Sequence, residues 1–330
     1  MHTRRLGYSG LALTPIGLGT WAMGGSGWLF GWGEQDDAAS VDAIRAGLDA
    51  GINWIDTAAI YGHGHAEEIV GRALKGRRDQ VIVATKCGRV WEGESRVIGK
   101  SLRRESVLAE VDRSLQRLGV DVIDLYQIHW PEPDEQVEEG WTAIRDLIAA
   151  GKVRFGGVCN FNVSQLERAQ AIHPVTSLQP PYSMLRREIE AEIVPWCAAH
   201  DVGILAYSPM QAGLLTGAFT AARAAGLAAD DWRARSPMFQ EPQLSLNLRL
   251  VDGLRPIAAR LGLSVSQLVL GWTLRLPTIT SAIAGARSAD QIQETVRGGD
   301  VRLDAGVIAE IEALLTSRTR ELEELTRPAS

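Results

Sequence analysis

Residues 121–158 read DVIDLYQIHWPEPDEQVEEGWTAIRDLIAAGKVRFGGV and contain two strand-like segments with a helix-like segment between them. The apolar runs Val122–Ile128 and Val153–Val158 have the length and continuity of buried strands. A helix is expected from about Asp134, because the apolar positions there recur every three or four residues and end at a glycine: Val137, Trp141, Ile144, Leu147, Ile148 and Gly151. This order predicts a parallel βαβ unit.

The same alternation continues along the chain in both directions. The other expected strands are Ile16–Gly19, Ile52–Ile55, Val81–Thr85, Val175–Gln179, Val202–Tyr207 and Ile279–Ala284. The helices that follow the eight strands are expected to begin near Asp36, Glu67, Ser101, Asp134, Ser164, Glu188, Asn247 and Ser288. Eight strand–helix units predict an α/β fold, a (β/α)8 TIM barrel, with residues 1–330 as a single domain.

Some segments fall outside this repeat. Residues 1–14 predict an N-terminal β-hairpin around Gly7 to Gly10, and Ser264–Leu276 predicts an extra helix. Residues 210–246 have no sustained period, which indicates a long functional loop. Three helix starts fit a capping box, in which a hydroxyl and a later carboxylate or carboxamide bind free N–H groups: Ser164 with Glu167, Ser264 with Gln267, and Ser288 with Gln291.

Composition excludes several classes of protein. The 34 basic and 40 acidic residues give a net charge of −6, which disfavours binding to nucleic acid or to an anionic membrane surface. No apolar run reaches the length of a transmembrane helix, and the N-terminus lacks the apolar core of a signal peptide, so a cytoplasmic location is expected. The three cysteines, Cys87, Cys159 and Cys197, are expected to be reduced thiols, since their number is odd and their spacing fits no zinc motif. The oligomeric state stays open.

Four polar residues follow three adjacent strands of the expected barrel. Asp56 and Tyr61 come after the second strand, Lys86 after the third, and His129 after the fourth. Because active sites of (β/α)8 barrels lie at the carboxyl ends of the strands, these side chains should face one rim. Taken singly, each also has an ordinary structural explanation, such as a helix cap, a turn residue or a solvated lysine.

Six segments together resemble the aldo-keto reductase family. They read NWIDTAAIYGHG, IVATKCG, VIDLYQIHWPEP, KVRFGGVCNF, AYSPMQAGLLTG and IAGARSADQ, they occur in the family's order, and they cover nearly the whole chain. The resemblance implies reduction of a carbonyl, with Asp56, Tyr61, Lys86 and His129 as the catalytic tetrad. Tyr61 would donate the proton, and His129 would hydrogen-bond the carbonyl oxygen beside it. We expect Lys86, held by Asp56, to lower the pKa of Tyr61 below its ordinary value near 10.

The resemblance also implies NADPH, with NADH less favoured. No GxGxxG motif opens a βα unit, so the sequence does not support a Rossmann domain. Asn160 and Gln179 would bind the carboxamide, Tyr207 would stack on the nicotinamide, and Arg287 with Ser288 would bind the 2′-phosphate. The full expected cofactor set is Thr20, Trp21, Asp56, Cys159, Asn160, Gln179, Tyr207, Ser208, Pro209, Gly213, Leu214, Gly285, Arg287, Ser288, Gln291 and Glu294. Arg287 has a second interpretation, as half of a surface ion pair.

The sequence departs from the family pattern at three places. Cys159 stands where serine is common, which weakens one expected hydrogen bond to the carboxamide, and Thr295 replaces a frequent asparagine at the adenine end. His65-Ala66 lacks the usual small hydroxyl residue. His63 and His65 have no third ligand at metal spacing, so no metal is expected.

Tryptophan is abundant in the expected loops at the strand ends. Ten tryptophans are present, and we expect an aromatic substrate pocket made by Trp21, Trp28, Phe30, Trp32, Trp91 and Trp130, although some of these will only pack loops together. TKCGRVWE and SLRRESV are similar to a bacterial subgroup associated with polyols and stress, which favours a small-molecule carbonyl substrate derived from a sugar or polyol. Two rival hypotheses are a metal-dependent barrel hydrolase and an NADPH-binding redox-sensor module with slow turnover.

Overall fold

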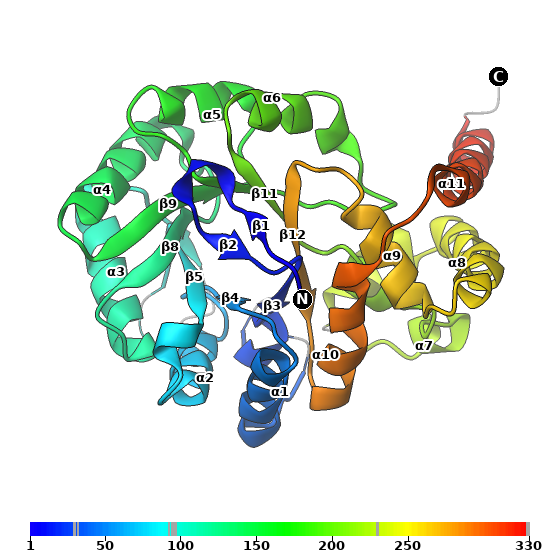
Figure 1. The fold of residues 1–330 in the computed structure, drawn as a ribbon, viewed down its shortest axis with the longest axis horizontal. Helices are drawn as coiled ribbons and strands as arrows, with labels where there is room; N and C mark the ends of the chain where they lie inside the picture. The colour runs from blue at the N-terminus through cyan, green and yellow to red at the C-terminus, as the bar shows by residue number, and fades with distance from the viewer. Residues whose placement is uncertain (29–30, 32, 92, 94–97, 229–230, 328–330) are drawn as a thin grey trace.

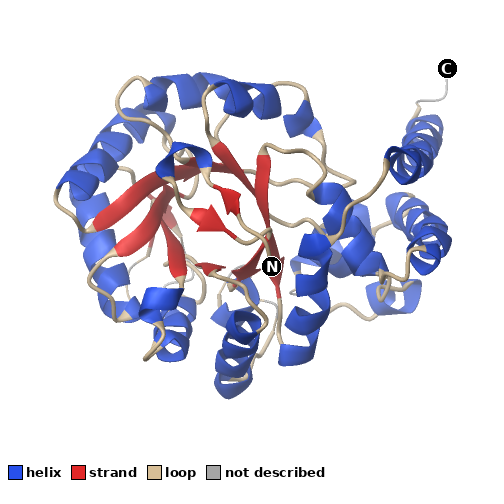
Figure 2. Ribbon diagram, viewed as in Figure 1, coloured by secondary structure: helices blue, strands red, loops and turns tan. Residues whose placement is uncertain are grey.

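The computed structural model describes residues 1–28, 31, 33–91, 93, 98–228 and 231–327, and in these residues eight parallel strands close into a barrel. The strands pair in chain order, and the last pairs with the first: β3 (Ile16–Gly19), β4 (Trp54–Asp56), β5 (Ile82–Cys87), β8 (Ile123–Ile128), β9 (Val153–Cys159), β10 (Ser177–Gln179), β11 (Gly203–Ala206) and β12 (Ile279–Gly285). Figure 2 shows the strands at the centre, with helices around them. The predicted (β/α)8 barrel is confirmed.

Each barrel strand is followed in the chain by a helix, and most of these helices pack around the outside of the barrel (Figure 1). In strand order these are α1 (Asp37–Asp49), α2 (His65–Leu74), α3 (Arg104–Leu118), α4 (Val137–Ala149), α5 (Val163–Gln170), α6 (Ile193–Ala199), α8 (Gln243–Arg260) and α10 (Ala289–Val296). Apolar side chains of the helices and of the outward-facing strand positions form one large buried cluster. Burial of this cluster supplies the main stabilisation of the fold.

The predicted N-terminal hairpin is confirmed and closes one end of the barrel. β1 (Arg4–Arg5) pairs antiparallel with β2 (Ala12–Leu13), and Figure 1 shows the pair lying across the end of the barrel that faces the viewer. Leu6, Leu11 and Leu13 of this segment join the cluster inside the barrel, which includes Trp54. The indole Nε1 of Trp54 donates to Thr14 O at 3.2 Å, which links the segment that follows the hairpin to strand β4 of the barrel.

Further elements surround the core. α9 (Val265–Thr273) confirms the predicted extra helix, with the Ser264–Gln267 capping box at its start. The unperiodic segment 210–246 contains α7 (Ala221–Ala225) between short turns. Two elements were not predicted: the hairpin of β6 (Arg89–Val90) with β7 (Gly99–Lys100), and α11 (Ala305–Thr326), which lies beside α8.

Two predicted helix caps differ in the structure. The capping box of α5 uses Asn162 and Gln165, two residues earlier than the predicted Ser164 and Glu167. At α10, the Ser288 hydroxyl accepts from Gln291 N as expected, but the Gln291 side chain binds Arg287 N at 2.8 Å. Asparagine caps a helix as well as serine does, so the residue types alone did not select the start of α5.

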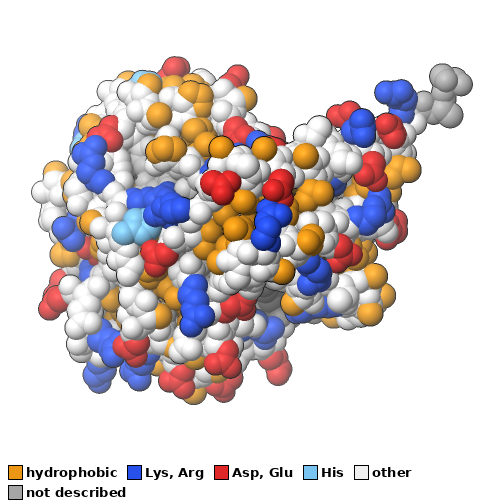
Figure 3. All heavy atoms as spheres, turned by 45° about the vertical axis from the view of Figure 1, so that its right-hand side comes forward, with side chains coloured by type: hydrophobic (Ala, Val, Ile, Leu, Met, Phe, Trp, Pro, Cys, Tyr) orange, Lys and Arg blue, Asp and Glu red, His pale blue; other side chains and the backbone are white. Residues whose placement is uncertain are grey.

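The surface mixes both signs of charge. Figure 3 shows acidic and basic side chains interspersed over the face it presents, with hydrophobic side chains between them. None of the helices in the described part of the chain is long and apolar enough to cross a membrane.

Candidate active site

Three adjacent strands carry polar side chains to one end of the barrel. Asp56 is the last residue of β4, Lys86 lies near the end of β5, and His129 directly follows β8. Tyr61 reaches the same place from the loop after β4. That loop turns at Gly62, whose φ is +62° and where a Cβ would lie 2.2 Å from Gly24 O, so only glycine fits. The four residues are therefore brought together as the sequence predicts.

A buried ion pair lies beside the Tyr61 hydroxyl. Lys86 Nζ lies 2.7 Å from Asp56 Oδ2 and donates to Thr57 O at 2.8 Å and to the Tyr61 hydroxyl at 3.3 Å. Asp56 and Lys86 are 3% and 2% exposed, so water does not screen their charges. The ammonium is aimed at the phenol oxygen by partners that leave it little freedom.

The pKa values of this group differ from the sequence-based expectation. Burial alone would lower the pKa of Lys86, but the Asp56 carboxylate opposes it and the pKa is raised. Burial raises the pKa of Tyr61 to about 12, although Lys86 acts in the opposite direction. The expected net lowering of the Tyr61 pKa is therefore wrong for the site as it stands, because desolvation of the phenolate outweighs the ammonium.

His129 lies beside the phenol with a neutral ring. Its imidazole meets the Tyr61 ring edge to face, with centroids 5.9 Å apart. Burial, followed by the charges of Lys86 and Arg89, lowers the pKa of His129 well below its ordinary value. No hydrogen bond to the ring nitrogens is found in the described part of the chain, so a neutral ring N–H can serve an incoming ligand.

A layer of amides supports Asp56 from inside the barrel. Gln179 Nε2 donates to Asp56 Oδ1 at 2.8 Å, and Gln127 Nε2 approaches the same oxygen at 3.5 Å. Cys159 Sγ lies 3.8 Å from Gln127 Oε1. Sequence reasoning missed Gln127. Its signal was a polar residue near the end of a buried strand, β8.

A large pocket opens over this group. Its volume is about 1420 Å³, and it runs from the barrel mouth to one side of α10. Most of the predicted site residues line it: Thr20, Trp21, Asp56, Tyr61, His129, Asn160, Gln179, Tyr207, Ser208, Pro209, Gly213, Gly285, Arg287, Gln291 and Glu294. Lys86, Cys159 and Leu214 are buried behind the lining. Ser288 caps α10 from outside the lining.

The comparisons with known proteins agree with this geometry. The aldo/keto reductase family model matches residues 15–316, most of the chain. An aldo-keto reductase of Bacillus subtilis, YhdN, is 40% identical over 86% of this chain and 85% of its own. The chain belongs to the aldo/keto reductase family. It is therefore an oxidoreductase.

Further relatives of this aldo-keto reductase differ in their named activities. An NADH-specific methylglyoxal reductase of Escherichia coli is 34% identical, over 94% of this chain and 98% of its own. The structure of the glycerol dehydrogenase AKR11B4 from Gluconobacter oxydans superposes with a TM-score of 0.87 at 36% identity, over 96% and 95% of the two chains. The structure of an aldo/keto reductase from Klebsiella pneumoniae, in complex with NADP and acetate, superposes with a TM-score of 0.72 at 27% identity, over 96% of both chains.

The loop after β11 gives this aldo-keto reductase a run of backbone suited to an anion. Ser208, Gln211 and Ala212 have φ values of 53°, 46° and 52°, and Gly213 follows at 95°. A turn of this kind can point backbone N–H groups at an anion, as in an anion-binding nest. Two of its N–H groups already donate within the turn, Gln211 N to Ser208 O at 3.0 Å and Gly213 N to Met210 O at 3.2 Å. Tyr207 precedes the run and donates through its hydroxyl to Asn160 Oδ1 at 2.9 Å.

Arg287 lies at the far end of the pocket and is exposed. Its guanidinium binds Gln35 Oε1 at 2.7 Å and Glu34 O at 2.6 Å. Neither partner is charged, so the arginine is positioned while its positive charge stays available for a ligand. The alternative of a surface ion pair does not hold within the described residues.

The aromatic wall is only partly the one predicted. Trp21, Trp28 and Trp130 line the pocket, and Trp21 stacks on Tyr61 with centroids 6.1 Å apart. Trp91 instead packs against His63 at 5.3 Å. Phe30 and Trp32 lie outside the described residues. Sequence reasoning missed Trp232 and Phe239, which come from the unperiodic segment 210–246 and also line the pocket.

The two loop histidines considered for a metal site have other partners. His63 packs on Trp91, and His65 Nε2 lies 2.8 Å from Asp37 Oδ1. No group of three metal-ligating side chains is found among the residues that the structure describes.

Proposed function

We propose that this chain reduces the carbonyl of a small molecule to an alcohol with NADPH, and that Tyr61 donates the proton. Membership of the aldo/keto reductase family supports carbonyl reduction in general. The observation that carries the finer proposal is the buried Lys86–Asp56 pair, whose ammonium lies 3.3 Å from the Tyr61 hydroxyl at the base of the pocket. We take residues 1–330 to act as one domain, in the cytoplasm.

The residues of the pocket fit a dinucleotide. The volume of about 1420 Å³, the left-handed backbone run and the flat face of Tyr207 suit, in turn, its size, its diphosphate and its nicotinamide ring. Bound NADPH would supply the hydride. Asn160 and Gln179 would bind the carboxamide, the Ser208–Gly213 run the diphosphate, and Arg287 the 2′-phosphate.

The chain's own residues would handle the oxygen and its proton. The carbonyl oxygen would lie between the Tyr61 hydroxyl and the neutral His129 ring, which both donate hydrogen bonds as negative charge develops. Tyr61 then gives up its proton. Even with a pKa of about 12, a phenol is a stronger acid than an aliphatic alcohol, so transfer to the alkoxide is favourable. Lys86 would stabilise the phenolate that remains.

The raised pKa of Tyr61 also favours a direction. At neutral pH the phenol stays protonated and ready for reduction, whereas oxidation of an alcohol needs the phenolate as a base. We therefore expect the reductive rate to change little between about pH 6 and pH 9, and the oxidative rate to rise with pH.

For the substrate we propose a sugar- or polyol-derived carbonyl. The structural similarity to a glycerol dehydrogenase supports this class, and so does the wall of aromatic faces, which stack on sugars. The relative from Escherichia coli is NADH-specific, which favours NADH as the cofactor. We propose NADPH because the exposed Arg287 offers a positive charge for the 2′-phosphate, which NADH lacks.

A cofactor-oxidation assay tests the proposal. The purified protein would be mixed with NADPH or NADH and a panel of aldehydes, ketoses and inositol-derived ketones. We expect oxidation of NADPH with at least one hydroxylated carbonyl. Absence of turnover across the panel, with NADPH tightly bound and oxidised only slowly in a single turnover, would instead support the redox-sensor module.

A further inference from the structure

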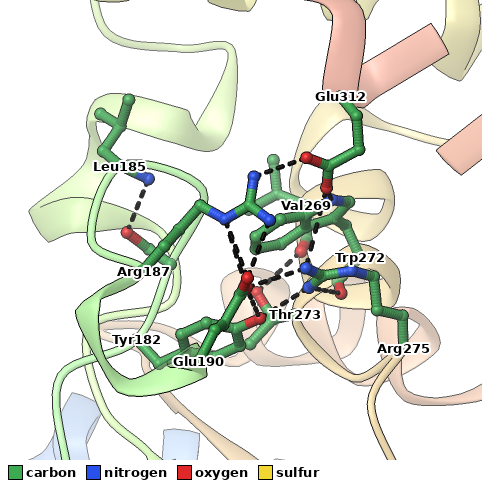
Figure 4. A network of polar contacts seen from close by, with 10 residues as sticks. Tyr182, Leu185, Arg187, Glu190, Val269, Trp272, Thr273, Arg275 and Glu312 are labelled. Atoms are coloured by element: carbon green, nitrogen blue, oxygen red, sulfur yellow. Dashed lines mark hydrogen bonds and ion pairs between the residues drawn. The ribbon is translucent and has the colours of Figure 1, made fainter. Parts of the chain in front are cut away.

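Two neighbouring arginines in the loop after β10 have opposite surroundings. Arg187 lies 2.8 Å from Glu190 and 2.5 Å from Glu312, and Figure 4 shows its guanidinium between these carboxylates. Arg186 is half-buried and lines the main pocket. Within the described residues its guanidinium has no hydrogen bond or ion pair. One charge is therefore satisfied by the fold, and the other is left facing the pocket.

The turn that carries Arg186 is held by several hydrogen bonds. Ser183 and Arg186 exchange two backbone hydrogen bonds of 3.1 Å each. The Tyr182 hydroxyl donates to Glu190 at 2.6 Å, within the network that Figure 4 draws around Arg275 and Glu312. Because the backbone is already fixed, Arg186 loses less conformational entropy when it binds a ligand than an arginine on a loose loop would.

The same turn is tied to the anion-binding nest. Gln211 Nε2, from within the left-handed run, donates to Ser183 Oγ at 2.6 Å in a buried contact. Tyr207 lies just before the run. Burial raises the pKa of Tyr207 to about 12, and the positive charge of Arg186 is the largest opposing effect. The guanidinium therefore lies within electrostatic reach of the residue proposed to stack on the nicotinamide.

Most other cations of the pocket already have partners. Arg89 and Lys100 share Glu132, Arg233 pairs with Asp231, and Arg255 pairs with Asp252. Arg287 is held at the opposite end by Gln35 and Glu34, and Arg223 lies over the Phe219 ring. In the part of the chain that the structure describes, Arg186 combines an unpaired charge with a place in the same pocket lining as Tyr207.

We propose that Arg186 binds the phosphate on the nicotinamide side of the dinucleotide's diphosphate, an assignment that rests on the proposed function. Backbone N–H groups of a nest supply only partial charges, whereas a diphosphate carries full negative ones. A guanidinium adds a full charge and two parallel N–H donors that match phosphate oxygens. Arg186 and the nest would hold this phosphate from two sides.

Binding of cofactor fragments to the substrate-free protein tests this assignment. Quenching of tryptophan fluorescence or calorimetry would give Kd for NADPH, for reduced nicotinamide mononucleotide and for 2′,5′-ADP. Arg186→Gln should raise Kd roughly tenfold or more for the first two, because a charged hydrogen-bond pair is lost. It should leave Kd for 2′,5′-ADP unchanged, since that fragment lacks the nicotinamide-side phosphate. Arg186→Lys should recover part of the loss.

Arg223→Gln is the matched control, because it removes the same charge from the same pocket without touching the nest. It should leave all three Kd values close to those of the wild type. Equal weakening in both variants, or unchanged NADPH binding in Arg186→Gln, would overturn the assignment. A folded wild-type protein that binds no dinucleotide would overturn the proposed function itself, which is a different result.

Discussion

The two ends of the barrel differ sharply, and strand β4 shows the difference within three residues. Trp54, at its start, is fully buried among apolar side chains of the N-terminal hairpin. Asp56, two residues further, holds Lys86 at the base of an open pocket. Residues two apart in a strand lie about 7 Å from each other on the same face. The end covered by the N-terminal hairpin, the closed end, therefore has apolar packing around Trp54 that stabilises the fold. The opposite end, the open end, has a buried ion pair at the base of the pocket.

The largest effect is expected from Tyr61→Phe at the open end. Loss of the hydroxyl removes the proposed proton donor, so kcat should fall by roughly 10²- to 10⁴-fold. Kd for NADPH and the unfolding midpoint should change little, because the phenyl ring keeps its stacking on Trp21. Steady-state kinetics and a denaturant titration measure both. Near-normal turnover would remove Tyr61 from the mechanism.

Trp54→Ala at the closed end should lower stability and leave cofactor binding in the folded protein nearly unchanged. The side chain fills the barrel interior so tightly that a Cβ on Gly17 would lie 2.0 Å from it. Its removal should reduce the free energy of unfolding by about 3–5 kcal/mol. Trp54→Phe should lose less, since it keeps most of the volume. In the fraction that stays folded, Kd for NADPH should remain near that of the wild type. A large loss of cofactor affinity with unchanged stability would contradict the division between the ends.

The sequence located the strands and the four residues at the open end because both depend on local pattern. Buried parallel strands are continuous apolar runs, and β3 has the predicted bounds, Ile16–Gly19. Asp56, Lys86 and His129 were found because strand ends of a parallel barrel meet at one rim. Neither step needs knowledge of contacts between distant residues.

The features of the site that the sequence did not predict depend on contacts between residues that are distant in the chain. Trp232 reaches the pocket by stacking on Trp21, more than two hundred residues away in sequence, from a segment with no period of its own. The neighbours of Gln127 come from three other strands. The sign of the Tyr61 pKa shift depends on a degree of burial that residue spacing does not reveal.

Arg287→Ala tests the outer rim of the open end, with a smaller expected effect. Loss of the guanidinium should raise Kd for NADPH by roughly 10- to 100-fold, as expected for the loss of a charged hydrogen-bond pair to phosphate. NADH, which has no 2′-phosphate, should bind nearly as before. Direct titration of both cofactors measures the ratio. Equal losses for the two would assign Arg287 a structural role and remove our reason to prefer NADPH.

The smallest effect concerns Glu110, a buried carboxyl on α3 behind the open end. It is 3% exposed and accepts hydrogen bonds from Gly88 N and from the Ser106 hydroxyl. Burial raises its pKa to about 7, against these hydrogen bonds. The folded state therefore binds a proton that the unfolded chain releases near its ordinary pKa. Stability from this group is complete at low pH and is lost as pH rises from about 4.5 through about 7.

Glu110→Gln keeps an acceptor for Gly88 N but cannot ionise. The variant should gain stability relative to the wild type as pH rises through that window, by about 1–2 kcal/mol after relaxation around the charge. Denaturant titrations at several pH values would give the difference curve, in which the other titrating groups cancel. A flat curve would show that Glu110 ionises freely in the folded state. A rising one would show that buried charge behind the open end lowers stability.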